Sequence, residues 1–136
     1  MRRRLLLLLL LALPFLGAAG LVWWTSGAAT SSGGPELQRL KGRWQRLDGG
    51  YMVEIRSVAD SGAMEAAYYN PRPIHVARAE ASRKGATTTV LIELRDVNYP
   101  GSTYTLTYDP VSDQLRGIYY QAVERQRFPV ALVSVR

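Results

Sequence analysis

Short runs in which apolar and polar residues alternate recur from Arg43 to the end of the chain. Eight such runs, rich in β-branched and aromatic residues, cover residues 43–47, 51–58, 63–69, 74–82, 87–95, 103–108, 114–122 and 127–135. Turn residues such as Asp48-Gly49-Gly50 and Asn70-Pro71-Arg72-Pro73 separate the runs. Alternation with a period of two, bounded by turn residues, is typical of β-strands. The pattern therefore predicts an all-β domain of eight strands.

The connections between these runs are too short to cross over a sheet, so successive strands must be antiparallel neighbours. Eight such strands can close on themselves, and closure removes the exposed sheet edges. We therefore expect a single eight-stranded antiparallel up-and-down β-barrel that follows an N-terminal hydrophobic helix.

The alternation also predicts which side chains face the barrel interior. The expected inner face includes Tyr51, Val53 and Ile55, then Val90, Ile92 and Leu94, then Tyr104, Leu106 and Tyr108. A barrel of this size is filled by its own side chains or holds one small ligand. A supply of aromatic residues favours filling: Tyr51, Tyr68 or Tyr69, Tyr104, Tyr108, Tyr119 or Tyr120, and Phe128.

The first part of the chain is not barrel. Three arginines, Arg2 to Arg4, precede an uncharged stretch from Leu5 to Trp24. This pattern is shared by cleaved signal peptides and by membrane anchors, and the length of the apolar stretch favours an anchor. Either way the following residues are delivered across the membrane. We expect residues 1–24 to be an anchor or signal peptide, 25–35 a flexible linker and 36–136 the barrel domain.

Composition adds a location and excludes some partners. With the three N-terminal arginines set aside, the net charge falls from +6 to +3, and the remaining basic residues are dispersed. This argues against a nucleic-acid partner. The chain has no cysteine, so the fold depends on its core alone. The expected place is the bacterial inner membrane facing the periplasm, or the periplasm or medium if the N-terminal segment is cleaved.

The residue inventory offers no convincing catalytic set. His75 is the chain's single histidine, and its position beside a proline-rich turn favours a surface or turn-capping role. Ser102, His75 and Asp96 lack any local signature of a nucleophile. No cysteine and no compact carboxylate group accompanies the histidine as metal ligands. We expect a protein that is not an enzyme and that has no cofactor and no metal.

Two stiff connections predict a ligand site instead. Pro71 and Pro73 restrain the chain on either side of Arg72, and Tyr99 begins a second Pro-Gly connection. In an up-and-down barrel both connections lie at the same end. They predict a barrel mouth lined by Tyr51, Tyr69, Asn70, Arg72 and Tyr99. The alternative is that both segments are only well-formed turns.

The start of the barrel carries a family resemblance. Gly42-Arg43-Trp44 followed by a meander of short strands resembles the calycin barrels: lipocalins, fatty-acid-binding proteins and avidins. The resemblance implies that Trp44 lies across the closed end, with Arg127 or Arg136 stacked on its ring. The avidin residues that contact biotin are not present after Trp44, so no biotin site is implied.

Longer segments resemble a group of small exported bacterial proteins of unknown function. The segments are Asp48-Gly49-Gly50-Tyr51, residues 69–74 and residues 99–104. This resemblance implies a bacterial envelope setting and no particular activity. Two functions stay open: a non-catalytic binding module for a small ligand at the barrel mouth, or a structural or interaction protein of the envelope with a filled barrel. The partners would be the membrane through the N-terminal segment, and a small molecule or an envelope protein.

Overall fold

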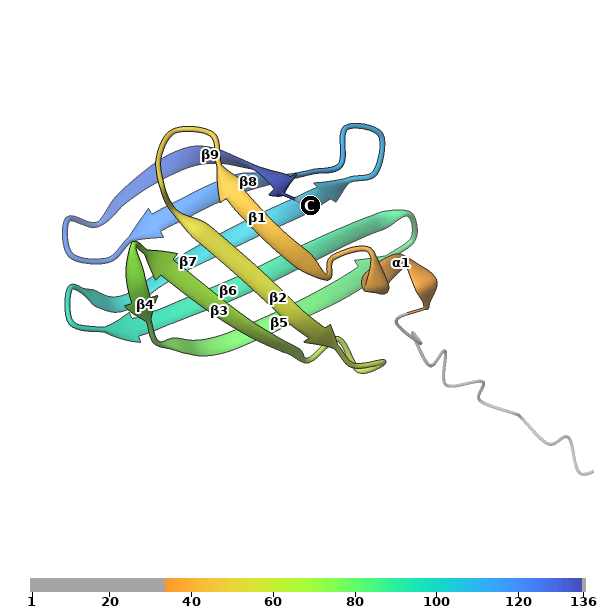
Figure 1. Ribbon diagram of the computed structural model, residues 1–136, viewed down its shortest axis with the longest axis horizontal. Helices are drawn as coiled ribbons and strands as arrows, with labels where there is room; N and C mark the ends of the chain where they lie inside the picture. Colours follow the sequence, from red (N-terminus) through yellow and green to blue (C-terminus); the bar gives the residue numbers. More distant parts are fainter. Residues whose placement is uncertain (1–33, 136) are drawn as a thin grey trace, which may run out of the picture.

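The computed structural model describes residues 34–135, which form one short helix and nine strands. The helix is α1 (Pro35–Gln38). The strands are β1 (Gly42–Arg46), β2 (Met52–Val58), β3 (Met64–Asn70), β4 (Arg72–Ile74), β5 (Val76–Lys84), β6 (Thr87–Asp96), β7 (Tyr99–Asp109), β8 (Gln114–Gln121) and β9 (Gln126–Val135). Figure 1 shows them wrapped into one barrel.

The strands form one antiparallel sheet in the order β4-β3-β2-β1-β9-β8-β7-β6-β5. The first and last strands are neighbours, and Trp44 pairs with Ser134 there. The sheet is therefore curled into a nearly closed barrel. The prediction of an all-β antiparallel barrel is confirmed, but the number of strands is nine and not eight.

The extra strand arises because the predicted run 74–82 is broken at His75. On one side of the break β4 pairs with β3, and on the other side β5 pairs with β6. The Asp96 carboxylate accepts the His75 backbone N–H at 2.8 Å, and the His75 carbonyl accepts the Arg95 N–H at 3.1 Å. The chain thus passes from one neighbour to the next at a single bent residue.

Between this bend and the closed end, β3 and β5 do not pair as continuous neighbours, so the barrel wall is incomplete there. The described strands meet again at a bridge between Ala63 and Glu80, where the Ala81 N–H donates to the Gly62 carbonyl at 2.7 Å. Gly62 has a φ of 89°, and a Cβ there would lie 2.0 Å from the Ala81 oxygen. Only glycine allows this close approach, which holds the two edges together.

The barrel is filled by side chains. The predicted inward-facing residues of β2, β6 and β7 are buried, which confirms the alternation. Of the aromatic alternatives, Tyr68 and Tyr119 face inward, whereas Tyr69 and Tyr120 are only partly buried. The largest fully buried side chains are Trp44, Tyr68, Tyr104, Leu40, Ile55, Ile92, Leu94, Leu106, Leu115, Leu132, Val53 and Val90.

One end of the barrel is closed by α1 and by Trp44. The Trp44 indole N–H donates to the Leu40 carbonyl at 2.8 Å. Its ring packs edge-to-face with the Tyr108 ring, and the two ring centres are 6.0 Å apart. Leu37 and Leu40 are buried beside them. Trp44 therefore packs at the end of the barrel that α1 covers.

The predicted anchor or signal peptide (1–24) and nearly all of the linker (25–35) lie outside the described residues. No helix within residues 34–135 is long and apolar enough to cross a membrane. The described chain begins at Gly34, next to α1. The described chain therefore begins at the closed end of the barrel, where Figure 1 shows α1.

Candidate functional site: the barrel mouth

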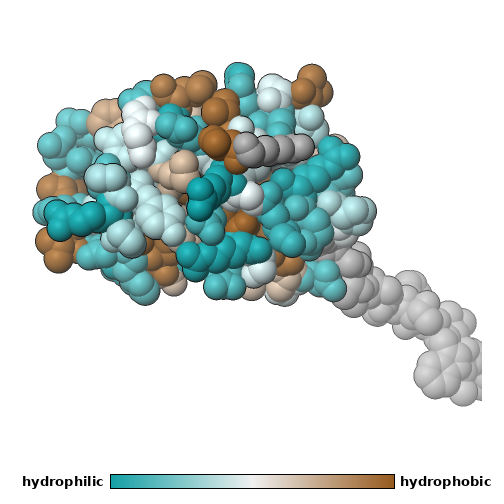
Figure 2. Space-filling model, in the orientation of Figure 1, coloured by the Kyte–Doolittle hydropathy of each residue, from teal (hydrophilic) through white to brown (hydrophobic). Residues whose placement is uncertain are grey.

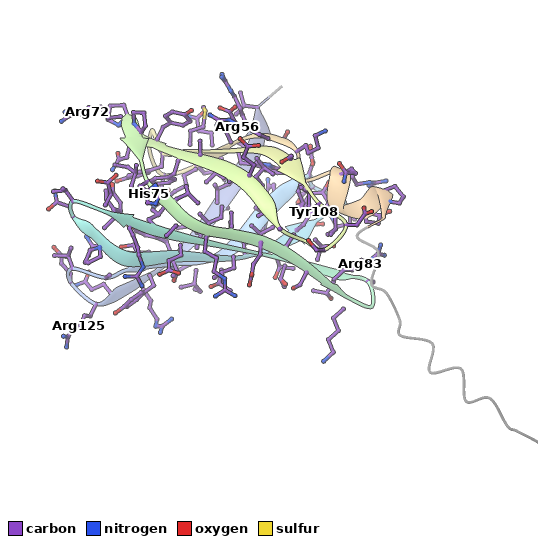
Figure 3. The ribbon with its side chains drawn as sticks, turned by 90° about the horizontal axis from the view of Figure 1, so that it is seen from below. Arg56, Arg72, His75, Arg83, Tyr108 and Arg125 are labelled. Carbon is purple, nitrogen blue, oxygen red and sulfur yellow. The ribbon has the colours of Figure 1, made fainter. Side chains whose placement is uncertain are left out.

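Four connections meet at the end of the barrel opposite α1: β1–β2, β3–β4, β6–β7 and β8–β9. The strand order of the sequence predicts this grouping, because antiparallel neighbours bring alternate connections to one end. Figure 3 shows Arg72 and Arg125 at this end, far from Tyr108 and α1. We call this end the mouth.

An arginine lies inside the barrel just below the mouth. Arg46 ends β1 two residues after Trp44, and both side chains therefore face the interior. Only 7% of the Arg46 side chain is exposed. Its Nη1 donates to the Tyr104 hydroxyl at 3.0 Å, and the guanidinium carbon lies 4.3 Å from the centre of the Tyr51 ring. A buried charge is costly unless it is paired and hydrogen-bonded, and these contacts meet part of that need.

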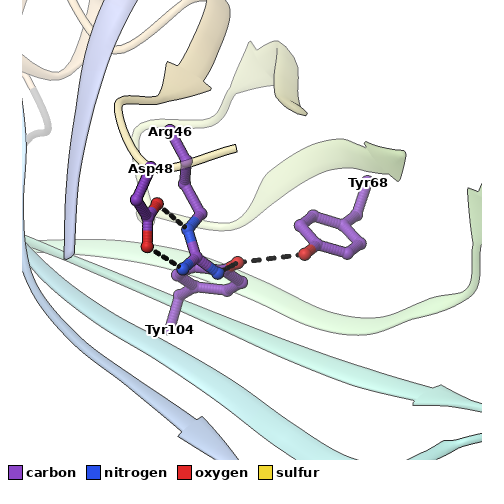
Figure 4. A network of polar contacts seen from close by, with 4 residues as sticks. All are labelled: Arg46, Asp48, Tyr68 and Tyr104. Carbon is purple, nitrogen blue, oxygen red and sulfur yellow. Dashed lines mark hydrogen bonds and ion pairs between the residues drawn. The ribbon is translucent and has the colours of Figure 1, made fainter. Parts of the chain in front are cut away.

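Inward-facing tyrosines continue from Arg46 across the barrel. The Tyr104 and Tyr68 hydroxyls are hydrogen-bonded at 3.0 Å, and the Tyr104 ring stacks on Tyr119 at 4.5 Å. Figure 4 shows Arg46, Tyr104 and Tyr68 joined in one network. Burial raises the pKa of Tyr104 to about 12 and also raises the pKa values of Tyr68 and Tyr119. These tyrosines are therefore neutral hydrogen-bonding groups at physiological pH.

Asp48 supplies the anion for Arg46. Its two carboxylate oxygens accept hydrogen bonds from Nε at 2.8 Å and from Nη2 at 2.5 Å (Figure 4). The Asp48 side chain is 55% exposed, although that of its partner is buried. The hydrogen bonds from Arg46 lower the pKa of Asp48. Burial disfavours the charged guanidinium, yet the hydrogen bonds that Arg46 donates to Asp48 and Tyr104 raise its pKa above the usual value. The pair is ionised at neutral pH.

The turn that carries Asp48 is fitted to the cluster. A Cβ on Gly49 would lie 2.6 Å from the Tyr51 ring, so a side chain at this position would have to displace that ring. The Arg46 N–H bonds the Tyr51 carbonyl at 3.0 Å across the base of the turn. The turn therefore holds Tyr51 against Arg46 and leaves Asp48 at the surface.

A cleft of about 490 Å³ opens at another side of the mouth. It is lined by Asn70, Arg72, Pro73, Ile74, Asp96, Val97, Asn98 and Tyr99. The Asn70 side-chain amide donates to the Tyr99 hydroxyl at 2.6 Å, which fixes both groups. The Asp96 carboxylate is engaged by the backbone N–H groups of His75 and Val97, which lower its pKa. Arg72 is exposed and supplies the cleft with a positive charge.

The five residues predicted to line the mouth fall into three places. Asn70, Arg72 and Tyr99 share the cleft. Tyr51 belongs to the interior cluster around Arg46. Tyr69 lies on the outer wall, where its hydroxyl accepts a hydrogen bond from Arg56 at 3.4 Å. Tyr68, the next residue on the same strand, takes the inward position, so strand alternation explains why Tyr69 is outside.

The two predicted stiff loops are mostly strand. Asn70 pairs with Arg72 across Pro71, so Arg72 begins β4 and does not lie in a loop. Asp96 pairs with Tyr99, which leaves a two-residue turn, Val97-Asn98, in front of β7. Asn98 has a φ of 67°, in the left-handed region that asparagine adopts more readily than most residues. The rigidity comes from sheet pairing, and the prolines add to it.

The predicted stacking of Arg127 on Trp44 is wrong. The Arg127 guanidinium lies over the Tyr120 ring at 5.1 Å. Arg127 is near the start of β9 at the mouth, whereas the β9 residue beside Trp44 is Ser134. The alternative residue, Arg136, lies outside the described residues.

Arg46 and Asp48 are the functional candidates that the sequence analysis missed. The sequence did contain the signal. Trp44 was expected to face the interior, and Arg46 is two residues further along the same strand, so it faces the same side. His75 is exposed, as expected for a surface residue. The described residues contain no group of three or more histidine, cysteine, aspartate or glutamate side chains arranged to hold a metal. Among them every buried side-chain nitrogen and oxygen has a hydrogen-bond partner.

Comparison with known proteins found no matching family model, no matching curated protein and no matching solved structure. The geometry of the mouth is therefore the basis for a functional proposal.

Proposed function

We infer that the protein is a non-catalytic binding module that takes a small anionic or aromatic ligand at the barrel mouth. The observation that carries this proposal is the cleft of about 490 Å³, in which Arg72 stands beside the fixed Asn70–Tyr99 pair. Ligand sites are typically concave, largely preformed and provided with a few well-placed polar groups. The cleft is concave and presents the Arg72 guanidinium beside the Asn70–Tyr99 pair.

The proposed setting is the bacterial envelope, with the barrel exported and held by residues 1–24. Attachment through Gly34 is at the closed end, so an anchor there would leave the mouth uncovered. A binding site at the opposite end from the anchor is accessible to a diffusing ligand. The same arrangement applies if the N-terminal segment is cleaved.

Native mass spectrometry of the full-length protein, purified gently from an envelope fraction, tests the proposal. We expect a small molecule that co-purifies and disappears on denaturation. Arg72→Ala should remove it without lowering the melting temperature, because Arg72 is exposed. Arg83→Ala, the same charge change at the closed end (Figure 3), should retain it. A ligand-free mass for the wild type contradicts the proposal.

The filled interior favours a second candidate, a structural or interaction protein of the envelope. Tyr68 and Tyr104 occupy interior space that a ligand carrier of the calycin type would leave open. Such a protein would act through its outer surface. A ligand-free mass together with capture of an envelope protein would support this candidate over the first.

A further inference from the structure

The guanidinium of Arg46 is contacted on three sides by tyrosine side chains. Tyr104 bonds Nη1, and its ring is stacked on Tyr119. The rings of Tyr51 and Tyr119 lie 4.3 and 5.3 Å from the guanidinium carbon. The hydroxyl of Tyr68 supports Tyr104 from behind. The position and direction of the cation are therefore fixed by the barrel.

The fourth side is covered by a group that can leave. Asp48 stands on a turn with two following glycines, and more than half of its side chain faces water. Its two hydrogen bonds form the paired geometry that any carboxylate makes with arginine. An external carboxylate can therefore take the same two donors while Asp48 moves into solvent, and the core need not change.

Exposed apolar residues lie at the same end of the barrel, at the left of Figure 2. Phe128 pairs with Tyr119 across β8 and β9 and has the inward parity of Val130, yet it is 39% exposed at the rim. Leu47 and Val123 are exposed on the neighbouring turns. A ligand whose charged end reaches Arg46 would thus lay its body against aromatic and aliphatic groups.

We propose that Arg46 is a binding site for the carboxylate of a small aromatic acid, and that Asp48 occupies this site when the acid is absent. Arg46 and Asp48 do not line the cleft beside Arg72. The site is therefore separate from the one described above, and either can fail without the other. The acid has to displace the Asp48 carboxylate from Arg46. Its apparent affinity therefore depends on the competition between the two carboxylates for this guanidinium.

The test is a titration of the full-length, ¹⁵N-labelled protein with benzoate, and with benzamide as the neutral control of the same shape. We expect benzoate to shift the backbone amides of Gly49, Gly50 and Tyr51 in a saturable manner. The indole N–H of Trp44 at the closed end should not shift. Benzamide should have little effect, because it lacks the charge that pairs with Arg46.

The decisive variant is Asp48→Ala, which removes the competitor and leaves Arg46 in place. Benzoate should bind about tenfold more tightly, the effect of removing a competing interaction of about 1.4 kcal/mol. Asp60→Ala, the same charge change in the turn after β2, should bind benzoate as the wild type does. Arg72→Ala should also leave benzoate binding unchanged. In the Asp48→Ala background, Arg46→Gln should abolish binding.

Three results would overturn the proposal. The first is that Asp48→Ala shows no saturable benzoate binding, or binds no more tightly than the wild type. The second is that benzamide binds as well as benzoate. The third is that benzoate shifts are centred on Trp44 or on Arg72. The dispersion of the backbone amide signals in the same ¹⁵N spectra reports whether Asp48→Ala is folded, so the first result is distinguished from unfolding.

Discussion

Trp44 and Arg46 are two residues apart on β1, and both point into the barrel, but they serve opposite ends. Around Trp44 the packing is apolar, with one indole hydrogen bond to Leu40. Around Arg46 it is polar, with a carboxylate, hydroxyls and ring faces. The closed end stabilises the fold, whereas the mouth holds a charge that a hydrophobic residue would replace at little cost.

The largest expected effect is at the closed end. Trp44→Ala removes a fully buried indole and should lower the free energy of unfolding by about 3–5 kcal/mol. That is a large part of the stability of an ordinary domain, about 5–15 kcal/mol. Trp44→Phe should cost about 1–2 kcal/mol, since it keeps a ring but leaves the Leu40 carbonyl without its donor. Denaturant unfolding followed by circular dichroism measures both, and equal losses would contradict the packing argument.

The next effect is the loss of stability in alkali, which comes from the mouth. The pKa of Tyr104 is raised from its ordinary 10.0 to about 12 by burial. Above pH 10 the unfolded chain loses this proton first, so the stability should fall by about 2–3 kcal/mol as the pH rises to about 12. Below pH 10 the contribution is fully present. Unfolding measured across this range should show a smaller slope for Tyr104→Phe, and an unchanged slope would contradict the assignment.

A smaller effect separates the two members of the ion pair. Asp48→Ala leaves the Arg46 charge without its carboxylate and should cost about 1–2 kcal/mol at neutral pH. Arg46→Met replaces the charge by an apolar chain and should cost less than about 1 kcal/mol, because Asp48 is then simply solvated. The Asp48 contribution is present above its ordinary pKa of 3.8 and is lost as the pH falls through its lowered value. If Arg46→Met were more damaging than Asp48→Ala, the pair would be structural.

The smallest effect belongs to the outer wall. Arg127 lies over Tyr120 and is exposed, so Arg127→Ala should change the free energy of unfolding by less than about 1 kcal/mol. The same denaturant measurement checks it. A larger loss would mean that the β8–β9 hairpin depends on this contact. The outer contacts of the mouth would then contribute to its stability as well as the interior ones.

Much of the fold could be predicted from alternation alone. The inward positions of Val90, Ile92 and Leu94 follow from the period of two, and so does the burial of Tyr104. The bend at His75 could not be predicted, because it depends on hydrogen bonds to Asp96 and Arg95, which come from a distant strand. The local sequence pattern predicts where strands form. It does not predict where the chain stops pairing with one strand and begins to pair with another, because that depends on tertiary contacts.

The site was predicted less completely than the fold. Asn70 and Tyr99 were placed at the mouth correctly, because strand order brings their segments to one end. Arg46 was missed since a charged residue is not expected in a core, although its parity with Trp44 put it there. Arg127 was assigned by resemblance to a position that the direction of β9 excludes. At these positions the alternation of side chains along a strand is a better guide than the family resemblance.

The contrast between the two ends is tested most directly by proton exchange at two side chains. The Trp44 indole N–H and the Arg46 Nε–H can be followed in one ¹⁵N spectrum of the full-length protein. We predict that Trp44 exchanges only through global unfolding, whereas Arg46 exchanges faster through local opening of Asp48. Asp48→Ala should further increase the exchange rate of the Arg46 Nε–H, relative to the rate of global unfolding that the Trp44 indole N–H reports. Equal protection of both protons, with the same response to denaturant, would show that the mouth is as fixed as the closed end and would contradict the account.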